Sequence, residues 1–282
     1  MDSRFSAYLQ RVRLPAVPPP DAEGLETLLV AHREAIAFEN FDIPLGRPIA
    51  IDSDSVFAKL VTDGCGGYCY EQNRLLADML ALLDLPSRPL LARVRLGATS
   101  DDHPPRTHTL LLLEIGGSPW IADAGFGGSY VPALPLIDGA FAETSDGASH
   151  RFRRIGQLGS LAGEWVLERA GARETADGRA HPDESWQAQY TFDLSEVAPS
   201  DLVKTNHWTS TAPSSRFTNL CIATRVLPGG FASLIDRSLC VSGSQSESRE
   251  IADAPAYVET LRETFGLDLP LEDVERWPIF AH

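Results

Sequence analysis

The chain has 282 residues, of which 43% are hydrophobic, and its formal net charge at pH 7 is −15. This hydrophobic content predicts packed cores and excludes a largely disordered chain. The acidic balance disfavours a general nucleic-acid binder and a protein that binds anionic membranes, because both need a cationic surface. We therefore expect neither nucleic acid nor a membrane as a partner.

The cysteine content and the N-terminal segment both predict a soluble cytoplasmic protein. Four cysteines in a chain of this length are too few for a disulfide framework. The first 14 residues are charged and lack the apolar core of a secretion signal. The longest apolar runs fall far short of the ~20 residues that a membrane-spanning helix needs.

The first third of the chain predicts helices. Residues 5–12 carry apolar side chains at helical spacing. Asp21 can cap a second helix, and Asp52 or Asp54 can start a short third one. A further helix-forming run, residues 71–83, directly follows the segment GGYCY at residues 66–70. Apolar side chains and a histidine mark one side of the second helix: Leu25, Leu28, Leu29 and His32.

The rest of the chain predicts strands and then a mixture. Short strands are expected at residues 90–96, 107–115, 120–122, 151–155, 164–169 and 187–192, which together indicate a small barrel or sandwich. The last third predicts a helix over residues 195–208 and a hairpin of residues 217–226 and 231–241. A final helix is expected at residues 257–265.

Cys69 lies between a pair of glycines and the start of a predicted helix. A lone cysteine is more often a small buried hydrophobe than a nucleophile. A thiol at a helix start, however, faces the positive end of the helix dipole, which favours the thiolate. A backbone amide at the same turn could also donate to an oxyanion. We therefore predict that Cys69 is a nucleophile.

His108 and Asp123 are predicted to meet across a hairpin. His108 opens an apolar strand, which is a poor place for an imidazole without a partner. Gly116-Gly117 indicates a tight turn near the midpoint of the two residues, so antiparallel pairing brings Asp123 alongside the start of the first strand. Cysteine, histidine and aspartate then form an activated-nucleophile triad.

Two other readings of the glycines and cysteines are weaker. Residues 125–128, GFGG, lack the features of a nucleotide-binding loop, since neither a GK[ST] ending nor a full GxGxxG is present. Cys65 and Cys69 have C-x3-C spacing without a second pair nearby, so zinc is not expected. We predict no metal.

Five segments together resemble the arylamine N-acetyltransferase family, which includes N-hydroxyarylamine O-acetyltransferases. Residues 38–42, FENFD, are similar to its FENLD-type segment, and residues 66–71, GGYCYE, to its RGGxCxE block. Residues 106–108, RTH, resemble its histidine strand, and residues 123–127, DAGFG, its D[VA]GFG block. Residues 211–217, TAPSSRF, resemble its TSPxSxF segment. The similarity runs in chain order over roughly residues 5–241.

The resemblance implies an α+β fold with a papain-like cysteine-nucleophile core. Its expected parts are an N-terminal helical bundle over residues 1–85, a central β-barrel over 86–195 and a C-terminal α/β lid over 196–282. It implies Cys69 as nucleophile, His108 as base and Asp123 as the residue that orients the base.

The resemblance also implies the substrates. Acetyl-coenzyme A is the expected acyl donor, and an arylamine, hydrazine or N-hydroxyarylamine is the expected acceptor, in a ping-pong reaction through acetyl-cysteine. The expected acceptor-binding residues are Phe38, Tyr70, Phe126 and Phe217, and those on the coenzyme A side are Gly127, Ser214 and Ser215. The sequence leaves open whether the chain forms a homo-oligomer.

One residue departs from the family pattern. Cys65 stands where the family usually has arginine, which the resemblance pairs with the acidic residue matched by Glu39. Removing only the cation would leave a buried carboxylate unpaired, at a cost of several kcal/mol. We therefore expect another cation, Arg47 or Arg74, to take its place, or Glu39 to be hydrated.

Three alternatives stay open at this point. A related amide synthase would use the same triad to close a macrolactam and would need a larger acceptor channel. A cysteine protease or transglutaminase would share the geometry but act on peptides. A catalytically weakened member of the family would act as a binding protein, with Cys65 as the mark of lost catalysis.

Overall fold

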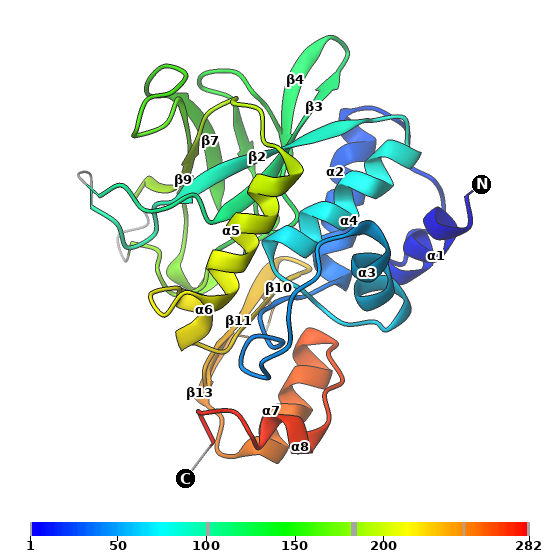
Figure 1. Ribbon diagram of the computed structural model, residues 1–282, viewed down its shortest axis with the longest axis vertical. Coiled ribbons are helices and arrows are strands. Elements are labelled where there is room, and N and C mark those ends of the chain that lie inside the picture. Colours follow the sequence, from blue (N-terminus) through cyan, green and yellow to red (C-terminus); the bar gives the residue numbers. More distant parts are fainter. Residues whose placement is uncertain (1, 100–101, 182–184, 245, 281–282) are drawn as a thin grey trace.

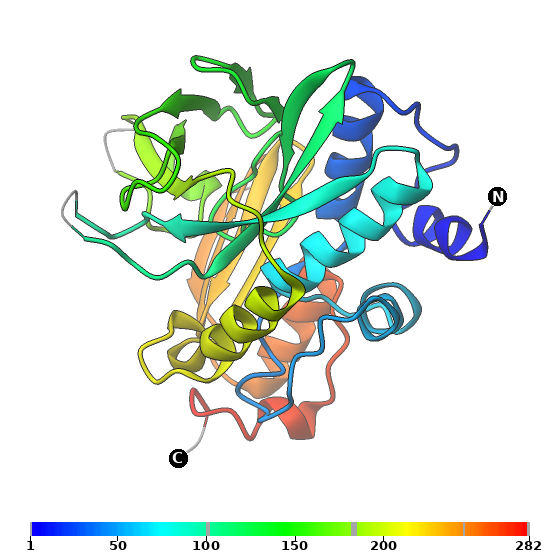
Figure 2. The ribbon, with the colours of Figure 1, turned by 45° about the horizontal axis from the view of Figure 1, so that its top comes forward.

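A computed structural model describes residues 2–99, 102–181, 185–244 and 246–280 (Figure 1). Helices from the first third of the chain lie on one side, and the strands of the middle third lie beside them. A second sheet and the C-terminal helices complete the molecule (Figure 2). This mixed architecture of helix and sheet agrees with the predicted α+β class.

The first third of the chain is helical, as predicted. Two predicted caps are confirmed: the Asp21 carboxylate accepts from the N–H of Gly24 at 2.9 Å, and that of Asp52 from the N–H of Ser55 at 3.0 Å. These bonds satisfy N–H groups that a helix start leaves unpaired. The elements are α1 (Ser3–Arg11), α2 (Ala22–Ala35), α3 (Ser53–Phe57), the π-helix η1 (Ala58–Thr62) and α4 (Cys69–Leu82).

Helix α4 lies in the centre of this helical layer and has its apolar face in the core. Leu76 and Leu80, one turn apart, are fully buried, and they belong to one cluster with Leu25 and Leu28 of α2. The same cluster includes Leu111. The apolar face of α4 therefore packs in one core with α2 and with Leu111 of the middle third of the chain.

Among the described residues, eight strands form one antiparallel, nearly closed sheet in the order β5-β4-β3-β2-β9-β8-β7-β6. The predicted barrel-like middle third is thus observed. In sheet order the strands are β5 (Leu134–Pro135), β4 (Ser118–Ala122), β3 (His108–Ile115), β2 (Ser87–Val94), β9 (Gln187–Phe192), β8 (Trp165–Ala170), β7 (Ser149–Arg154) and β6 (Phe141–Glu143).

The hairpin of β3 and β4 has the register that the sequence predicts. Leu111 pairs with Ala122 and Ile115 with Ser118. Gly116 and Gly117 both have positive φ angles, 59° and 76°, which glycine adopts without strain in such a turn. The chain therefore leaves β4 at Asp123, level with the beginning of β3.

The smaller sheet, among the described residues, has five antiparallel strands in the order β1-β10-β11-β12-β13. Its first strand, β1, comes from the N-terminal third and pairs Phe38 with Thr224. Through this pairing, residues 38–39 of the N-terminal third become part of a sheet formed by the C-terminal third of the chain. The strands are β1 (Phe38–Glu39), β10 (Ile222–Leu227), β11 (Gly230–Ile235), β12 (Ser238–Ser242) and β13 (Glu247–Glu250).

The remaining helices lie on or beside the two sheets (Figure 1). They are the 3-10 helix η2 (Arg173–Thr175), α5 (Pro199–Thr211), α6 (Arg216–Asn219), α7 (Ala254–Thr260), the π-helix η3 (Leu261–Phe265) and α8 (Leu271–Val274). In the described part of the chain, none of the helices combines the length and the apolarity that crossing a membrane requires. The three-part division at residues 85 and 195 stays a prediction.

Leu76→Ala tests the contribution of α4 to the core. Because Leu76 is fully buried, its truncation should lower the free energy of unfolding by about 3 kcal/mol. Leu82→Ala is the matched control in the same helix, since Leu82 is 42% exposed, and should change it little. Urea denaturation measures both, and equal losses would contradict this packing.

Candidate active site

Cys69 is the first residue of α4, and the residue before it is held in an extended conformation. The N–H of Tyr68 donates to the Glu71 carboxylate at 3.0 Å, so the first turn of the helix is closed by a capping interaction. The Cys69 side chain is buried, and its sulfur lies 3.7 Å from the carbonyl oxygen of Thr107. The nucleophile candidate therefore touches the residue adjacent to His108.

His108 and Asp123 form a buried pair. Nε2 of His108 lies 2.7 Å from Oδ2 of Asp123, and the carboxylate is fully buried. Its other oxygen accepts from the Asn73 amide at 3.1 Å and from the N–H of Gly125 at 2.9 Å. With Nε2 committed to Asp123, Nδ1 is the ring nitrogen that can take a proton from a thiol.

The surroundings of Asp123 keep it ionised. Burial alone raises the pKa of a carboxyl group, but the charge and hydrogen bond of His108 outweigh it, with help from Asn73 and Arg33. The pKa of Asp123 therefore lies below its ordinary value. An ionised carboxylate here orients the imidazole and stabilises its protonated form.

Arg33 of α2 holds the loop that carries Asp123. Its guanidinium donates to the carbonyl oxygens of Asp123 at 2.9 Å, Phe126 at 3.1 Å and Ser129 at 2.6 Å. Arg33 is 5% exposed, so these bonds form away from water. One buried cation thus fixes the backbone of both Asp123, which carries the orienting carboxylate, and Phe126.

The loop after Asp123 can approach the nucleophile only because residue 125 is glycine. A Cβ atom at Gly125 would lie 2.6 Å from Cα of Cys69 and 2.9 Å from its carbonyl oxygen. At Gly127 a Cβ would lie 2.6 Å from the Phe38 ring. Glycine at positions 125 and 127 of the GFGG segment is therefore required by close packing.

The surroundings of Cys69 shift the pKa of its thiol in the direction opposite to the sequence-based prediction. Burial raises the pKa of the thiol, and the negative charge of Asp123 adds to the rise. The backbone N–H groups of Thr109 and Tyr70 lower it, but by less. The helix start alone therefore does not produce a thiolate, because desolvation outweighs it, and ionisation requires a proton acceptor.

A cavity of about 210 Å³ lies against Cys69 and His108. The His108 ring also packs against the rings of Phe126 and Tyr190, with centroids 5.2 Å and 5.1 Å away. Six of the seven residues predicted to bind substrate or coenzyme A line this cavity: Phe38, Phe126, Phe217, Gly127, Ser214 and Ser215. The sequence-based set thus converges on one space.

Tyr70 is the exception. It borders a separate cavity together with Asn73 and Ala77, and its ring packs on Tyr68 at a centroid distance of 5.3 Å. Successive residues of an α-helix point in directions about 100° apart, which explains why Tyr70 and Cys69 line different cavities. Its role in substrate binding stays a prediction.

The cation beside Glu39 is neither Arg47 nor Arg74. Lys59 Nζ lies 3.6 Å from Oε1 of Glu39. Arg47 bonds to Asp273 at 2.7 Å, and Arg74 pairs with Asp78 on its own helix at 3.1 Å. The expected substitute cation therefore exists, but it comes from η1.

Several residues of the site escaped the sequence analysis. Asn73 lies one helical turn after Cys69, a spacing that places both on one face and could have indicated it. Arg33 and Lys59 carry no such local signal, since their partners are distant in the sequence. Arg179 also lines the cavity, and its guanidinium group pairs with the carboxylate of Asp177 at 2.6 Å. Arg216, which belongs to the TAPSSRF segment, lines the same cavity.

Within the residues that the structure describes, no group of three or more histidine, cysteine, aspartate or glutamate side chains is placed to hold a metal ion.

Comparison with known proteins gives one consistent result. The sequence profile of the N-acetyltransferase family matches residues 21–274. The arylamine N-acetyltransferase / N-hydroxyarylamine O-acetyltransferase of Salmonella typhimurium is 35% identical over 270 residues, which cover 95% of this chain and 90% of that protein.

Solved structures agree. An arylamine N-acetyltransferase structure from Salmonella typhimurium superposes with a TM-score of 0.86 at 31% identity, covering 97% of each chain. The Mycobacterium marinum arylamine N-acetyltransferase in complex with CoA superposes with a TM-score of 0.83, also at 31% identity, covering 96% of this chain and 97% of that one.

Arg33→Met tests the bracing of the Asp123 loop. The variant leaves three buried carbonyl oxygens without their donor, which should cost about 3 kcal/mol of unfolding free energy. The N–H of Gly125 should also exchange faster with solvent deuterium, because the loop loses its anchor. Arg74→Met, which removes a largely exposed arginine, is the control. Unchanged exchange at Gly125 in Arg33→Met would contradict the bracing role.

Proposed function

Since this chain belongs to the N-acetyltransferase family of arylamine N-acetyltransferases, we propose that it transfers an acetyl group from acetyl-coenzyme A to an arylamine, a hydrazine or an N-hydroxyarylamine by way of acetyl-Cys69. The observation that carries the proposal is the buried pair of His108 and Asp123 at 2.7 Å, together with the cavity that His108 and Cys69 both line. Cysteine, imidazole and carboxylate in this order make a nucleophile that can carry an acyl group.

The first half-reaction acetylates the sulfur of Cys69. The Cys69 thiol gives its proton to Nδ1 of His108, and Asp123 stabilises the imidazolium. The thiolate attacks the thioester carbonyl, and the bond between that carbon and the coenzyme A sulfur breaks. The departing sulfur takes the proton from His108, so coenzyme A leaves as a thiol. We propose that the Tyr70 N–H, which lowers the pKa of the Cys69 thiol, donates to the oxyanion.

The second half-reaction transfers the acetyl group from Cys69 to the acceptor. The amine nitrogen attacks the acetyl carbon of acetyl-Cys69, and His108 takes a proton from that nitrogen. The carbon–sulfur bond breaks, the proton returns to Cys69, and the acetylated amine leaves. Thioester exchange is nearly balanced in energy, so the intermediate stays reactive towards the acceptor.

The cavity favours an aromatic acceptor. Phe38, Phe126 and Phe217 supply its aromatic walls, and stacking on such a ring contributes about 1 kcal/mol. Arylamines stay neutral at pH 7, whereas alkylamines, like lysine, are mostly protonated and lack a free lone pair. A cavity of about 150 Å³ holds benzene, so 210 Å³ suits one substituted ring better than the tethered polyketide of an amide synthase.

The polar part of the cavity supports an anionic donor. Gly127, Ser214 and Ser215 line it beside Arg179 and Arg216, and these guanidinium groups suit phosphate oxygens. The Ser215 hydroxyl itself donates to the carbonyl oxygen of Thr209 at 2.5 Å, so it holds the loop rather than a ligand. We therefore propose that the coenzyme A diphosphate lies on this side.

Mass spectrometry after mixing with acetyl-coenzyme A tests the intermediate. The wild-type chain should gain the mass of one acetyl group at Cys69, and Cys69→Ala and Cys69→Ser should not. Cys65→Ser, which removes the neighbouring thiol, should still be acetylated. Acetylation that persists in Cys69→Ala would refute the assignment, and an unmodified wild-type chain would favour the binding-protein alternative.

Asp123→Asn tests the triad. An amide in this place holds His108 in the wrong tautomer, so kcat should fall by about 10⁴-fold while the fold persists. Asp146→Asn is the matched control, because Asp146 is equally buried but lies in the turn before β7. Coenzyme A release at saturating substrates measures kcat. Near-normal turnover of Asp123→Asn would exclude the proposed role of the carboxylate.

A further inference from the structure

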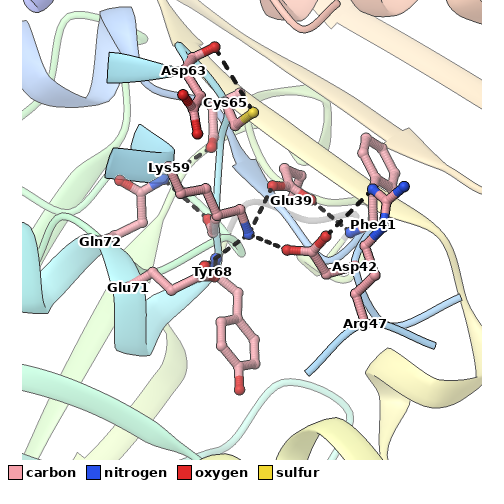
Figure 3. Close-up of polar contacts among 12 residues, drawn as sticks. Glu39, Phe41, Asp42, Arg47, Lys59, Asp63, Cys65, Tyr68, Glu71 and Gln72 are labelled. Carbon is pink, nitrogen blue, oxygen red and sulfur yellow. Dashed lines mark hydrogen bonds and ion pairs between the residues drawn. The ribbon is translucent and has the colours of Figure 1, made fainter. Parts of the chain in front are cut away.

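Lys59 lies among three carboxylates next to the nucleophile loop. Its Nζ is 2.6 Å from Oδ2 of Asp42, 2.7 Å from Oε1 of Glu71 and 3.6 Å from Oε1 of Glu39 (Figure 3). The lysine side chain is 21% exposed, while those of Glu39 and Glu71 are 5% and 2% exposed. Ion pairs screened this little by water hold their geometry more firmly than surface pairs do.

Two of these carboxylates belong to segments that build the active site. Glu71 accepts the N–H of Tyr68, the residue before Cys69, and so closes the first turn of α4. Glu39 lies on β1, whose residue Phe38 lines the cavity, and it accepts the N–H of Phe41 at 2.6 Å. Lys59 therefore bridges β1 and the first turn of α4, which carries the nucleophile.

The loop between them is anchored to the same residue. The carbonyl oxygen of Lys59 accepts the N–H of Cys65 at 3.0 Å, and the carbonyl oxygen of Gly67 accepts the N–H of Glu39 at 3.1 Å. Lys59 belongs to η1, a π-helical turn, and such turns are frequent at functional sites. Backbone and side chain of one residue thus meet all three segments around Cys69.

The charges explain why a cation is needed there. Burial raises the pKa of Glu71 to about 7, because desolvation and the nearby charge of Glu39 outweigh the opposing effect of Lys59. Burial alone would lower the pKa of Lys59, but its three carboxylate partners raise it above its ordinary value. Without the ammonium group the pKa of Glu71 would rise further, so Glu71 would take up a proton and the ion pairs that join it to Lys59 would be lost. Other ionisable groups around the cluster are Arg47, Asp63, Cys65 and Tyr68.

We propose that Lys59 is a positioning residue for Cys69: its ammonium group clamps β1, the loop of residues 65–67 and the first turn of α4 into the arrangement that acetyl transfer requires. It supplies, from residue 59, the cation that the family resemblance leads one to expect at residue 65. The test of this inference measures acetyl transfer and therefore rests on the proposed function. The contacts of Lys59 do not depend on that function.

Lys59→Met is the direct test, with Lys204→Met as the matched control. The chain has two lysines, and Lys204 is exposed on α5. We expect kcat for coenzyme A release to fall about 10²-fold in Lys59→Met with little change in KM, because a nucleophile misplaced by about 1 Å loses rate rather than binding. Lys204→Met should behave as the wild type.

Two rescue variants separate positioning from general stability. Lys59→Arg keeps the cation and should retain most of kcat. The double variant Lys59→Met/Cys65→Arg should regain at least about tenfold over Lys59→Met, because position 65 is electrostatically coupled to both Glu39 and Asp42. If Lys59→Met does not fold, these two variants still test the proposal, since each keeps a cation beside the carboxylates.

Three results would overturn the proposal. They are wild-type kcat in Lys59→Met, a folded double variant without any recovery, and a loss in Lys59→Met that appears only in KM. The wild-type chain is measured in the same series. If it releases no coenzyme A, the proposed function fails, whereas active wild-type enzyme together with an active Lys59→Met removes only the role of Lys59.

Discussion

The fully buried carboxylate of Asp123 is the group on which the site depends. A buried charge is tolerated only where partners replace its lost hydration, and Asp123 has them on both oxygens. His108 meets one oxygen, and Asn73 and the N–H of Gly125 meet the other. These partners come from α4, from β3 and from the loop after β4, so a single charge joins the helical layer to the larger sheet at the point where Cys69 lies.

The same physical rule governs the other side of the nucleophile. The carboxylates of Glu39 and Glu71 are buried, and Lys59 replaces their hydration. The thiol of Cys69 has no such permanent counter-charge, and burial raises its pKa. The carboxylates beside the nucleophile are thus paired with a lysine, whereas the thiol depends on proton transfer to His108 for its ionisation.

The sequence reveals what is local. The turn at Gly116-Gly117 and the alternating strands beside it place His108 near Asp123 by counting residues, and the hairpin has that register. Local patterns also predict the caps of α2 and α3. The predicted strand of residues 231–241, by contrast, is two strands, because Asp236 adopts a positive φ of 51° and reverses the chain.

Features of the site that depend on contacts between residues far apart in the sequence could not be predicted. Arg33 reaches the carbonyl oxygen of Asp123 across 90 positions of sequence, and at the end of α2 it looks like an ordinary basic residue of a last helical turn. The pKa of Cys69 reverses its predicted direction, because desolvation depends on neighbours that no local pattern reveals. The departure at Cys65 did indicate a missing cation, but only the fold identifies Lys59 as its replacement.

His108 makes a buried thiol ionisable, and the ultraviolet absorbance of the Cys69 thiolate measures this directly. The titration is recorded against pH as the difference from Cys69→Ala, which removes the signals of the other cysteines. In His108→Gln the thiolate of Cys69 should appear only at distinctly higher pH than in the wild-type chain, because burial then acts without a proton acceptor. An identical titration in both chains would show that the imidazole does not govern the sulfur, and would contradict the account.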